Sequence, residues 1–220
     1  MGQGFWALRE KEKALVAKPK KSRDKVFLNI PYDKKFERLF LAYIAGISAY
    51  GMVPHATLEI TDSSRRLEKI LKLARSCEYS VHDLSRVELD RTKPRTPRFN
   101  MPFELGLCVA DANRREGQRQ NWFLFEAVAN RVKKSLSDLD GTDPKIHGAT
   151  IRGVLSGLCD IFRRPGRQPT VPQMMQIYRG LRKNQAAILK EAGRNTLYTK
   201  RVFAGLCVVA SSDADRIVAD

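Results

Sequence analysis

The strongest constraint on the fold is an alternation of apolar runs and helical patterns along the first three quarters of the chain. Each run rich in strand-forming residues is followed, directly or after a loop, by a segment whose apolar residues recur at helical spacing. The expected strands cover 25–30, 52–57, 78–84 and 121–128, and the expected helices cover 34–50, 64–76, 101–113 and 149–162. Such alternation favours a parallel sheet covered by helices on both faces. We therefore predict a three-layer α/β domain with a mostly parallel sheet.

Two flanking segments lie outside this pattern. Residues 1–24 are polar and Lys-rich, which is typical of a basic N-terminal arm. Residues 163–220 open on a basic, Pro-rich linker and continue with a strongly helical stretch at 172–192, and we expect the last ten residues to fray. The predicted organisation is an arm, an α/β domain at 25–162, and a basic helical extension.

The positive charge of the chain is concentrated in three places. The 220 residues carry 40 Lys and Arg against 24 Asp and Glu, a formal charge of +16. Residues 1–25 have a net charge of +5, residues 86–98 of +3, and residues 163–201 of +9, so the rest of the chain is close to neutral. Clustered positive charge attracts phosphates, which favours a nucleic acid or a nucleotide as partner. A solvated, solubilising surface and an acidic protein partner remain open.

Composition excludes several other classes. The hydrophobic fraction of 43% is that of a globular protein. No apolar run approaches the ~18 residues of a membrane span, and the charged N-terminus lacks the apolar core of a signal peptide, so we expect a cytoplasmic protein without a membrane partner. The four cysteines and three histidines have no zinc-site spacing, and no Gly-rich phosphate loop occurs. We predict no metal and no resident cofactor, and the sequence leaves homo-oligomerisation open.

The candidate site is expected where the strands end, because open α/β sheets bind ligands at the carboxyl ends of their strands. The first and third strands are both followed by polar or aromatic residues. The candidates are Asn29, Pro31 and Tyr32 after the first strand, Asp83, Ser85 and Arg86 after the third, and Arg98, Asn100, Phe103 and Glu104 around the start of the next helix.

Glu104 is the candidate with the clearest chemistry. Asn100 is a suitable helix cap and Pro102 is tolerated in a first turn, so the sequence predicts Glu104 in the first turn of its helix. The positive end of the helix favours an ionised carboxylate there. Held beside apolar Phe103, such a group can act as a nucleophile or stabilise a sugar cation. The alternative is a Glu that only complements the helix dipole.

Three segments resemble the nucleoside deoxyribosyltransferase-like and TIR-like group of nucleotide N-glycosidases. They are KVFLNIPYD, RRLEKILKLARSCEYSVHDLS and NMPFELGL, and the resemblance covers roughly residues 25–160. It implies a flavodoxin-like or TIR-like fold with Glu104 as the catalytic carboxylate. It also implies that Asp83 acts near the third strand and that Asn29 and Tyr32 belong to the nucleotide loop. The activity implied is cleavage of the N-glycosidic bond of a nucleotide, with NAD as the favoured small substrate and anti-phage defence as a role.

Three functions therefore remain in competition. The first is cleavage of a small nucleotide such as NAD, and the second is removal of a base from DNA or RNA gripped by the basic segments. The third is a non-enzymatic module that binds a nucleotide or nucleic acid. Arg86 and Arg98 are candidates to hold phosphate, Tyr32 stacks on a base or closes its loop, and Asp83 is either catalytic or a loop cap.

Overall fold

The centre of the molecule is a parallel sheet of five strands. The structure is a computed structural model that describes residues 23–86, 93–97, 99–114, 121–139 and 141–218. The strands are β1 (Lys25–Asn29), β2 (Val53–Ala56), β3 (Tyr79–Asp83), β4 (Asn121–Glu126) and β5 (Lys145–Ile146). Their order is β2-β1-β3-β4-β5 and every pair is parallel. This is the order of flavodoxin-like sheets, and the predicted α/β fold class is confirmed.

The sheet contains one strand, β5, that is not among the four expected from the sequence. β5 is only two residues long and pairs with Phe125 and Glu126 at the end of β4. A two-residue strand carries too few side chains to show an alternating pattern. The backbone N–H of His147 continues the pairing by donating to the carbonyl of Glu126 at 3.0 Å. Residues 145–147 therefore supply the far edge of the sheet.

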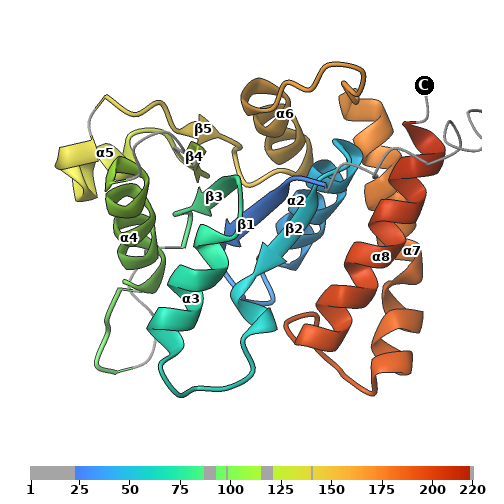
Figure 1. The fold of residues 1–220 in the computed structure, drawn as a ribbon, viewed down its shortest axis with the longest axis horizontal. Coiled ribbons are helices and arrows are strands. Elements are labelled where there is room, and N and C mark those ends of the chain that lie inside the picture. Colours follow the sequence, from blue (N-terminus) through green and yellow to red (C-terminus); the bar gives the residue numbers. More distant parts are fainter. Residues whose placement is uncertain (1–22, 87–92, 98, 115–120, 140, 219–220) are drawn as a thin grey trace, which may run out of the picture.

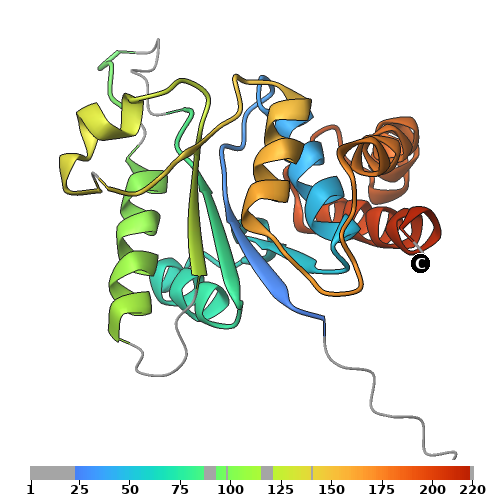
Figure 2. The ribbon, with the colours of Figure 1, turned by 90° about the horizontal axis from the view of Figure 1, so that it is seen from above.

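Helices cover both faces of the sheet, and a further helical pair lies outside one of them (Figures 1 and 2). One face carries α3 and α4, and the other carries α2 and α6, which are covered in turn by α7 and α8. The longer helices are α2 (Glu37–Ala49), α3 (Arg66–Arg75), α4 (Asn100–Arg114), α6 (Ile151–Ile161), α7 (Val171–Ala192) and α8 (Lys200–Ile217), and α5 (Arg131–Ser135) is a short helix after β4.

α2 is buried on all sides because it lies between the sheet and the C-terminal helices. All eleven of its residues from Leu39 to Ala49 are buried. At Gly46 a Cβ atom would collide with the side chain of Leu158, so the absent side chain permits the close approach of α6. The buried residues of α7 and α8 belong to the same apolar core as α2. The basic extension is thus packed onto the α/β fold through a shared core.

The ends of the chain differ in part from expectation. The last ten residues were expected to fray, yet α8 continues through them to Ile217 because Ala210, Ala214 and Val218 are buried. The predicted N-terminal arm lies outside the described residues except for its last two positions. Of these, Arg23 pairs with Asp215 of α8 at 2.8 Å. Within the described ranges, no helix is both long and apolar enough to cross a membrane.

Candidate functional site

One pocket collects five of the ten predicted site residues. It has a volume of about 330 Å³ and lies where β1 and β2 end, beside the first residues of α3 and α4. It is lined by the predicted residues Asn29, Pro31, Tyr32, Asn100 and Glu104, together with Ile30, Thr57, Arg66 and Met101. The volume is within the range of small-molecule sites, and the position is the one expected for a parallel sheet.

The Glu104 carboxyl group differs from the sequence prediction in its position along the helix and in its pKa. α4 begins at Asn100, and Phe103 donates its backbone N–H to the carbonyl of Phe99, so Asn100 belongs to the helix and Glu104 lies beyond its first turn. Burial raises the pKa of Glu104 from 4.5 to about 7, and the positive charge of Arg66 only partly opposes that rise. The prediction of a first-turn carboxylate kept ionised by the helix end is therefore wrong: desolvation outweighs the helix dipole.

The Asn29 side chain is held in a fixed orientation at the back of the pocket. Its amide nitrogen donates to the carbonyl of Met101 at 2.9 Å and to Nδ1 of His82 at 3.0 Å. His82 is fully buried, and burial lowers its pKa to about 3, so the ring is neutral and Nδ1 can accept. Both amide hydrogens are thus used inside the protein, which leaves the amide oxygen of Asn29 to face a ligand.

Tyr32 forms a wall of the pocket and is supported by the segment that connects α7 to α8. Its hydroxyl accepts a hydrogen bond from Thr57 at 3.1 Å, and its ring lies 5.5 Å from that of Tyr198. Tyr198 in turn donates its hydroxyl to the carbonyl of Asp33 at 2.6 Å. Between the two interpretations of Tyr32, these contacts favour loop closure, because the phenol is anchored on both sides.

Arg66 is the most informative pocket residue that sequence reasoning missed. It is the first residue of α3, it is exposed, and its guanidinium donates to the carbonyl of Ile60 at 3.2 Å. The helix end supplies further positive potential at the same place. A signal was available, since helix starts after a strand of an open α/β sheet commonly face the ligand. Thr57 was missed because it follows an unremarkable edge strand.

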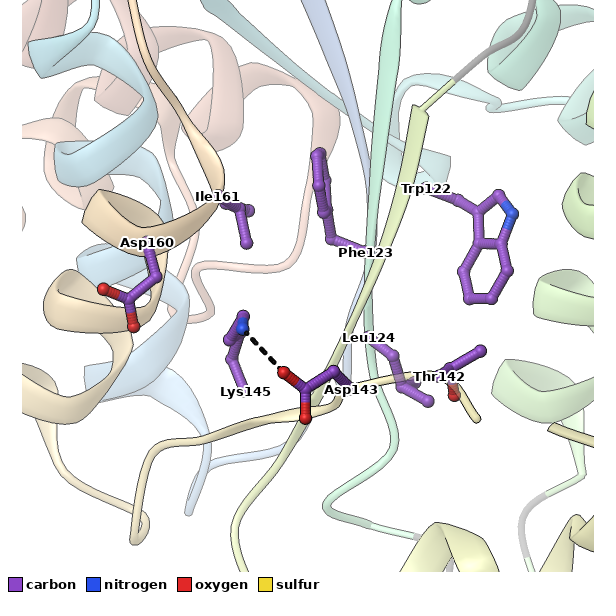
Figure 3. Close-up of a pocket in the computed structure, with 8 residues that line it drawn as sticks. All are labelled: Trp122, Phe123, Leu124, Thr142, Asp143, Lys145, Asp160 and Ile161. Atoms are coloured by element: carbon purple, nitrogen blue, oxygen red, sulfur yellow. Dashed lines mark hydrogen bonds and ion pairs between the residues drawn. The ribbon is translucent and has the colours of Figure 1, made fainter. Parts of the chain in front are cut away.

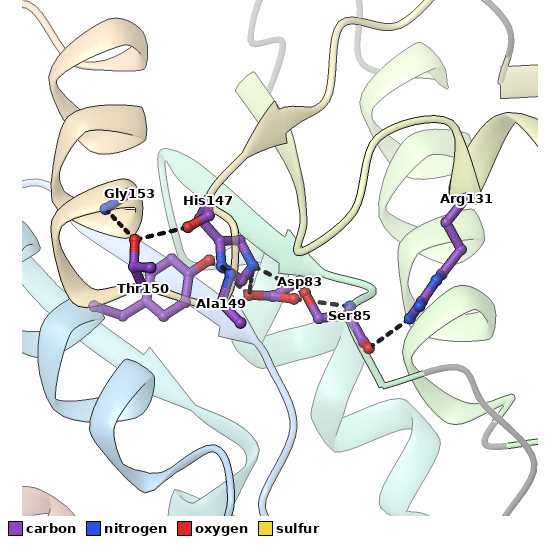
Figure 4. Close-up of polar contacts among 8 residues, drawn as sticks. Asp83, Ser85, Arg131, His147, Ala149, Thr150 and Gly153 are labelled. Carbon is purple, nitrogen blue, oxygen red and sulfur yellow. Dashed lines mark hydrogen bonds and ion pairs between the residues drawn. The ribbon is translucent and has the colours of Figure 1, made fainter.

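Asp83 and Ser85 belong to a different cluster, which is buried (Figure 4). Asp83 is fully buried and accepts hydrogen bonds from the hydroxyl of Tyr43 and the backbone N–H of Ser85, each at 2.8 Å. Nε2 of His147 lies 3.2 Å from the same carboxylate and 2.9 Å from the hydroxyl of Ser85. Arg131 donates to the Ser85 carbonyl at 3.1 Å. The cluster joins the ends of β3 and β5, and none of these residues lines the Glu104 pocket.

The hydrogen bonds of His147 argue against a nucleophilic triad in this cluster. Nδ1 accepts the backbone N–H of Ala149 at 3.1 Å, so the proton of a neutral ring resides on Nε2. Nε2 then donates toward Asp83 and Ser85 and has no lone pair with which to activate the Ser85 hydroxyl. The cluster is therefore a fixed structural connection, and the catalytic assignment of Asp83 finds no support in its surroundings.

Arg86 and Phe103 do not line the pocket. Arg86 pairs with Asp33 at 3.1 Å, which fixes the loop after β1. Phe103 points away from the core with 56% of its surface exposed, so it does not provide the apolar neighbour expected for Glu104. Arg98 lies outside the described residues.

A second cavity, of about 350 Å³, lies at the edge of β4 (Figure 3). It is lined by Trp122 and Phe123 and by an ion pair between Lys145 and Asp143 at 3.5 Å, with Asp160 of α6 nearby. It contains none of the predicted site residues and lies beside the middle of a strand rather than at the strand ends. The Glu104 pocket is the better candidate because it combines a perturbed carboxyl, a fixed amide and a guanidinium.

Comparisons of the chain with protein-family models, with curated proteins and with solved structures found no match. The chemistry of the site is therefore inferred from its own residues. A carboxyl with a pKa near neutrality can exchange protons, stabilise a cation or form a covalent bond to carbon, and the adjacent guanidinium can hold an anion.

Proposed function

We propose that the protein cleaves the N-glycosidic bond of a nucleotide, with Glu104 as the catalytic carboxylate. The observation that carries the proposal is the pocket itself, which is lined by one partly buried carboxyl group, a fixed amide and a guanidinium whose charge acts on that carboxyl. In this arrangement the sugar lies against Glu104 and the amide oxygen of Asn29 orients it. Arg66 holds the phosphate. The resemblance of NMPFELGL to nucleotide N-glycosidases supports the same role for Glu104.

The reaction requires negative charge beside the anomeric carbon. As the C1′–N bond breaks, its electron pair leaves with the base and the sugar becomes an oxocarbenium-like cation. An ionised Glu104 stabilises that cation or adds to it, and water then attacks C1′ and releases a proton. The stabilisation is strong because the carboxylate is partly removed from water.

NAD is the small substrate that this pocket favours. Its nicotinamide ring is cationic before cleavage and leaves as a neutral base, so no acid is needed to protonate the leaving group. Among the described residues that line the pocket, Glu104 is the only carboxyl group. A neutral base such as adenine would require an acid and a carboxylate together, whereas NAD requires the carboxylate alone.

The proposal is tested by incubating the purified protein separately with NAD, with nucleosides, and with single- and double-stranded DNA. Released base is separated by liquid chromatography and quantified. We expect free nicotinamide from NAD at a rate proportional to protein concentration. Release of no base from any of these substrates would refute the proposal and leave a binding module.

We predict that kcat/KM for NAD rises as pH increases through about 7. Burial sets the pKa of Glu104 at about 7, and only the ionised form stabilises the sugar cation. Activity should therefore be low at pH 6 and reach a plateau above pH 8. Because bound NAD places a positive charge next to the carboxylate, the midpoint in kcat should lie below that in kcat/KM. A flat profile between pH 6 and 8 would contradict the assignment of Glu104.

We predict that Arg66→Gln raises KM for a nucleotide substrate by roughly tenfold, the loss expected for one hydrogen bond to a charged group. The KM for the corresponding nucleoside, which lacks the phosphate, should rise much less. The pH midpoint of kcat/KM should also move upward, since the charge of Arg66 lowers the pKa of Glu104. Arg65→Gln is the matched control because its side chain is 79% exposed and does not line the pocket. Equal losses for nucleotide and nucleoside would exclude a phosphate-binding role.

A further inference from the structure

A cluster of exposed basic side chains lies where the start of α2 meets the middle of α7. We call it the basic cluster. It consists of Lys34, Lys35 and Arg38 around the first turn of α2, and Arg179, Arg182 and Lys183 on α7. Only the α7 members belong to the strongly basic segment identified in the sequence, and the fold brings the others to them from about 145 positions away.

The two parts of the cluster meet at Tyr178. α2 and α7 pack against each other, with Met174 of α7 beside Gly46 of α2. Burial raises the pKa of Tyr178, and the charges of Arg182 and Arg38 both oppose that rise, which agrees with this packing. Lys34 and Lys35 lie in the turn that leads into α2, within four residues of Arg38. Arg182 is three residues after Arg179, so helical spacing puts both on one side of α7.

The acidic groups that lie next to the cluster are paired with other residues. Asp213 of α8, whose carboxylate lies against Gly180 of α7, pairs with Arg216, and Asp33 pairs with Arg86. Within the described part of the chain, none of its six side chains forms an ion pair with a carboxylate. The single acidic residue of α7 is Glu191, two turns beyond Lys183, and Glu37 of α2 is half-buried. Six positive charges on one surface produce a potential that favours a polyanion.

The surroundings of the basic cluster help to decide between two kinds of polyanion, an anionic membrane and a nucleic acid. A helix that lies on a membrane presents an apolar face beside its basic one, but the apolar face of α7 is packed in the core through Met174, Ile177 and Leu181. None of the exposed large hydrophobic residues of the described chain belongs to α2 or α7. Three of the six basic residues are arginines, whose planar guanidinium groups match phosphate oxygens.

We propose that the basic cluster binds the sugar-phosphate backbone of a nucleic acid. The nucleotide-sized pocket lies alongside, since Tyr32 in its wall is only two residues before Lys34. The inference concerns binding and is independent of whether Glu104 cleaves a glycosidic bond. The protein can therefore bind a nucleic-acid strand at the basic cluster and act on a small nucleotide in the Glu104 pocket.

The test is fluorescence anisotropy with a labelled 20-nucleotide DNA strand and with the corresponding duplex, in a series of salt concentrations. The protein carries Glu104→Gln, so that turnover cannot interfere. The cluster variant combines Lys34→Gln, Lys35→Gln, Arg38→Gln and Arg182→Gln. At moderate salt we expect its affinity for the single strand to fall at least about tenfold, and the slope of log affinity against log salt to become shallower by about 3, at ~0.7 per lost contact.

A matched control removes four charges elsewhere, through Lys72→Gln, Lys133→Gln, Lys134→Gln and Arg152→Gln. These exposed residues lie on α3, α5 and α6, and none of them belongs to α2 or α7. We expect the control to lose less than threefold in affinity. Equal losses in both variants would show a non-specific charge effect and overturn the proposal. So would stronger binding to vesicles with anionic lipids than to either DNA, or an unchanged salt slope in the cluster variant.

Discussion

Glu104→Gln is expected to lower the rate of base release from NAD by roughly 10³-fold, the scale of losing one transition-state charge contact in a desolvated site. The amide has nearly the same shape as the carboxyl group but cannot carry the negative charge that opposes the sugar cation. Initial rates of nicotinamide release measure the loss. Glu68→Gln, on the exposed surface of α3, is the matched control and should retain parental activity.

The same substitution should stabilise the protein at alkaline pH. Because the folded-state pKa of Glu104 is about 7 rather than 4.5, the folded protein holds the proton more tightly than the unfolded chain does. That contribution to stability is complete below pH 4.5 and is lost as pH rises through 7. We compare the free energy of unfolding of the Glu104→Gln variant with that of the parent at each pH. From pH 4 to pH 8 this difference should shift by about 2 kcal/mol in favour of the variant, after allowance for the partial exposure of Glu104.

Two observations would contradict these expectations separately. Parental rates of base release by the Glu104→Gln variant would remove Glu104 as the catalytic carboxylate, whatever the stability data show. A difference in unfolding free energy that is the same at pH 4 and pH 8 would show that the carboxyl is not desolvated, whatever the rates show. Urea denaturation followed by circular dichroism supplies the second measurement.

Asp83→Ala is expected to cost about 3–5 kcal/mol in the free energy of unfolding, as removal of one partner from a buried charged network does. The substitution leaves the Tyr43 hydroxyl, the Ser85 N–H and the His147 ring without their shared acceptor. Asp83→Asn keeps the volume and one acceptor oxygen, so its cost should be smaller. The unfolding midpoint in urea measures both.

The control for Asp83 is Asp143→Ala, since that carboxylate is 97% exposed and pairs with Lys145 at the surface. Its removal should change stability by less than about 0.5 kcal/mol. Asp83→Ala should affect base release only through the fraction of folded protein. If it instead abolished release while the unfolding midpoint stayed at the parental value, Asp83 would be catalytic, as its place after the third strand first indicated.

Much of the fold can be predicted from local sequence patterns, because strand and helix periodicities recur along the chain in the order that a parallel sheet needs. The same rule placed Asn29, Tyr32 and Glu104 together, since the ends of neighbouring parallel strands and the starts of the following helices share one edge. The position of Arg66 near a helix start was a usable signal, but its approach to Glu104 depends on how α3 and α4 cross the sheet, which the sequence does not show.

Burial and long-range pairing account for the other differences between the sequence predictions and the structure. The sequence indicates a carboxyl near a helix end, but not the amount of water removed from it, and that amount decides the direction of the pKa shift of Glu104. Asp83 and His147 meet across 64 positions through β5, a strand too short to detect. The meeting of Arg38 with Arg182 likewise depends on the docking of α7 against α2.

The burial of α2 on every side has a consequence for how this architecture can change over time. A shortened chain without α7 and α8 would expose the apolar outer side of α2 to water. It would also lose Tyr198, whose ring packs against Tyr32. The sheet and the pair formed by α7 and α8 therefore depend on each other for a complete core, and neither can be removed without exposing apolar surface. Variation in length is easier to accommodate at the tip of this pair, around Gly193 to Asn195, where the chain turns in solvent.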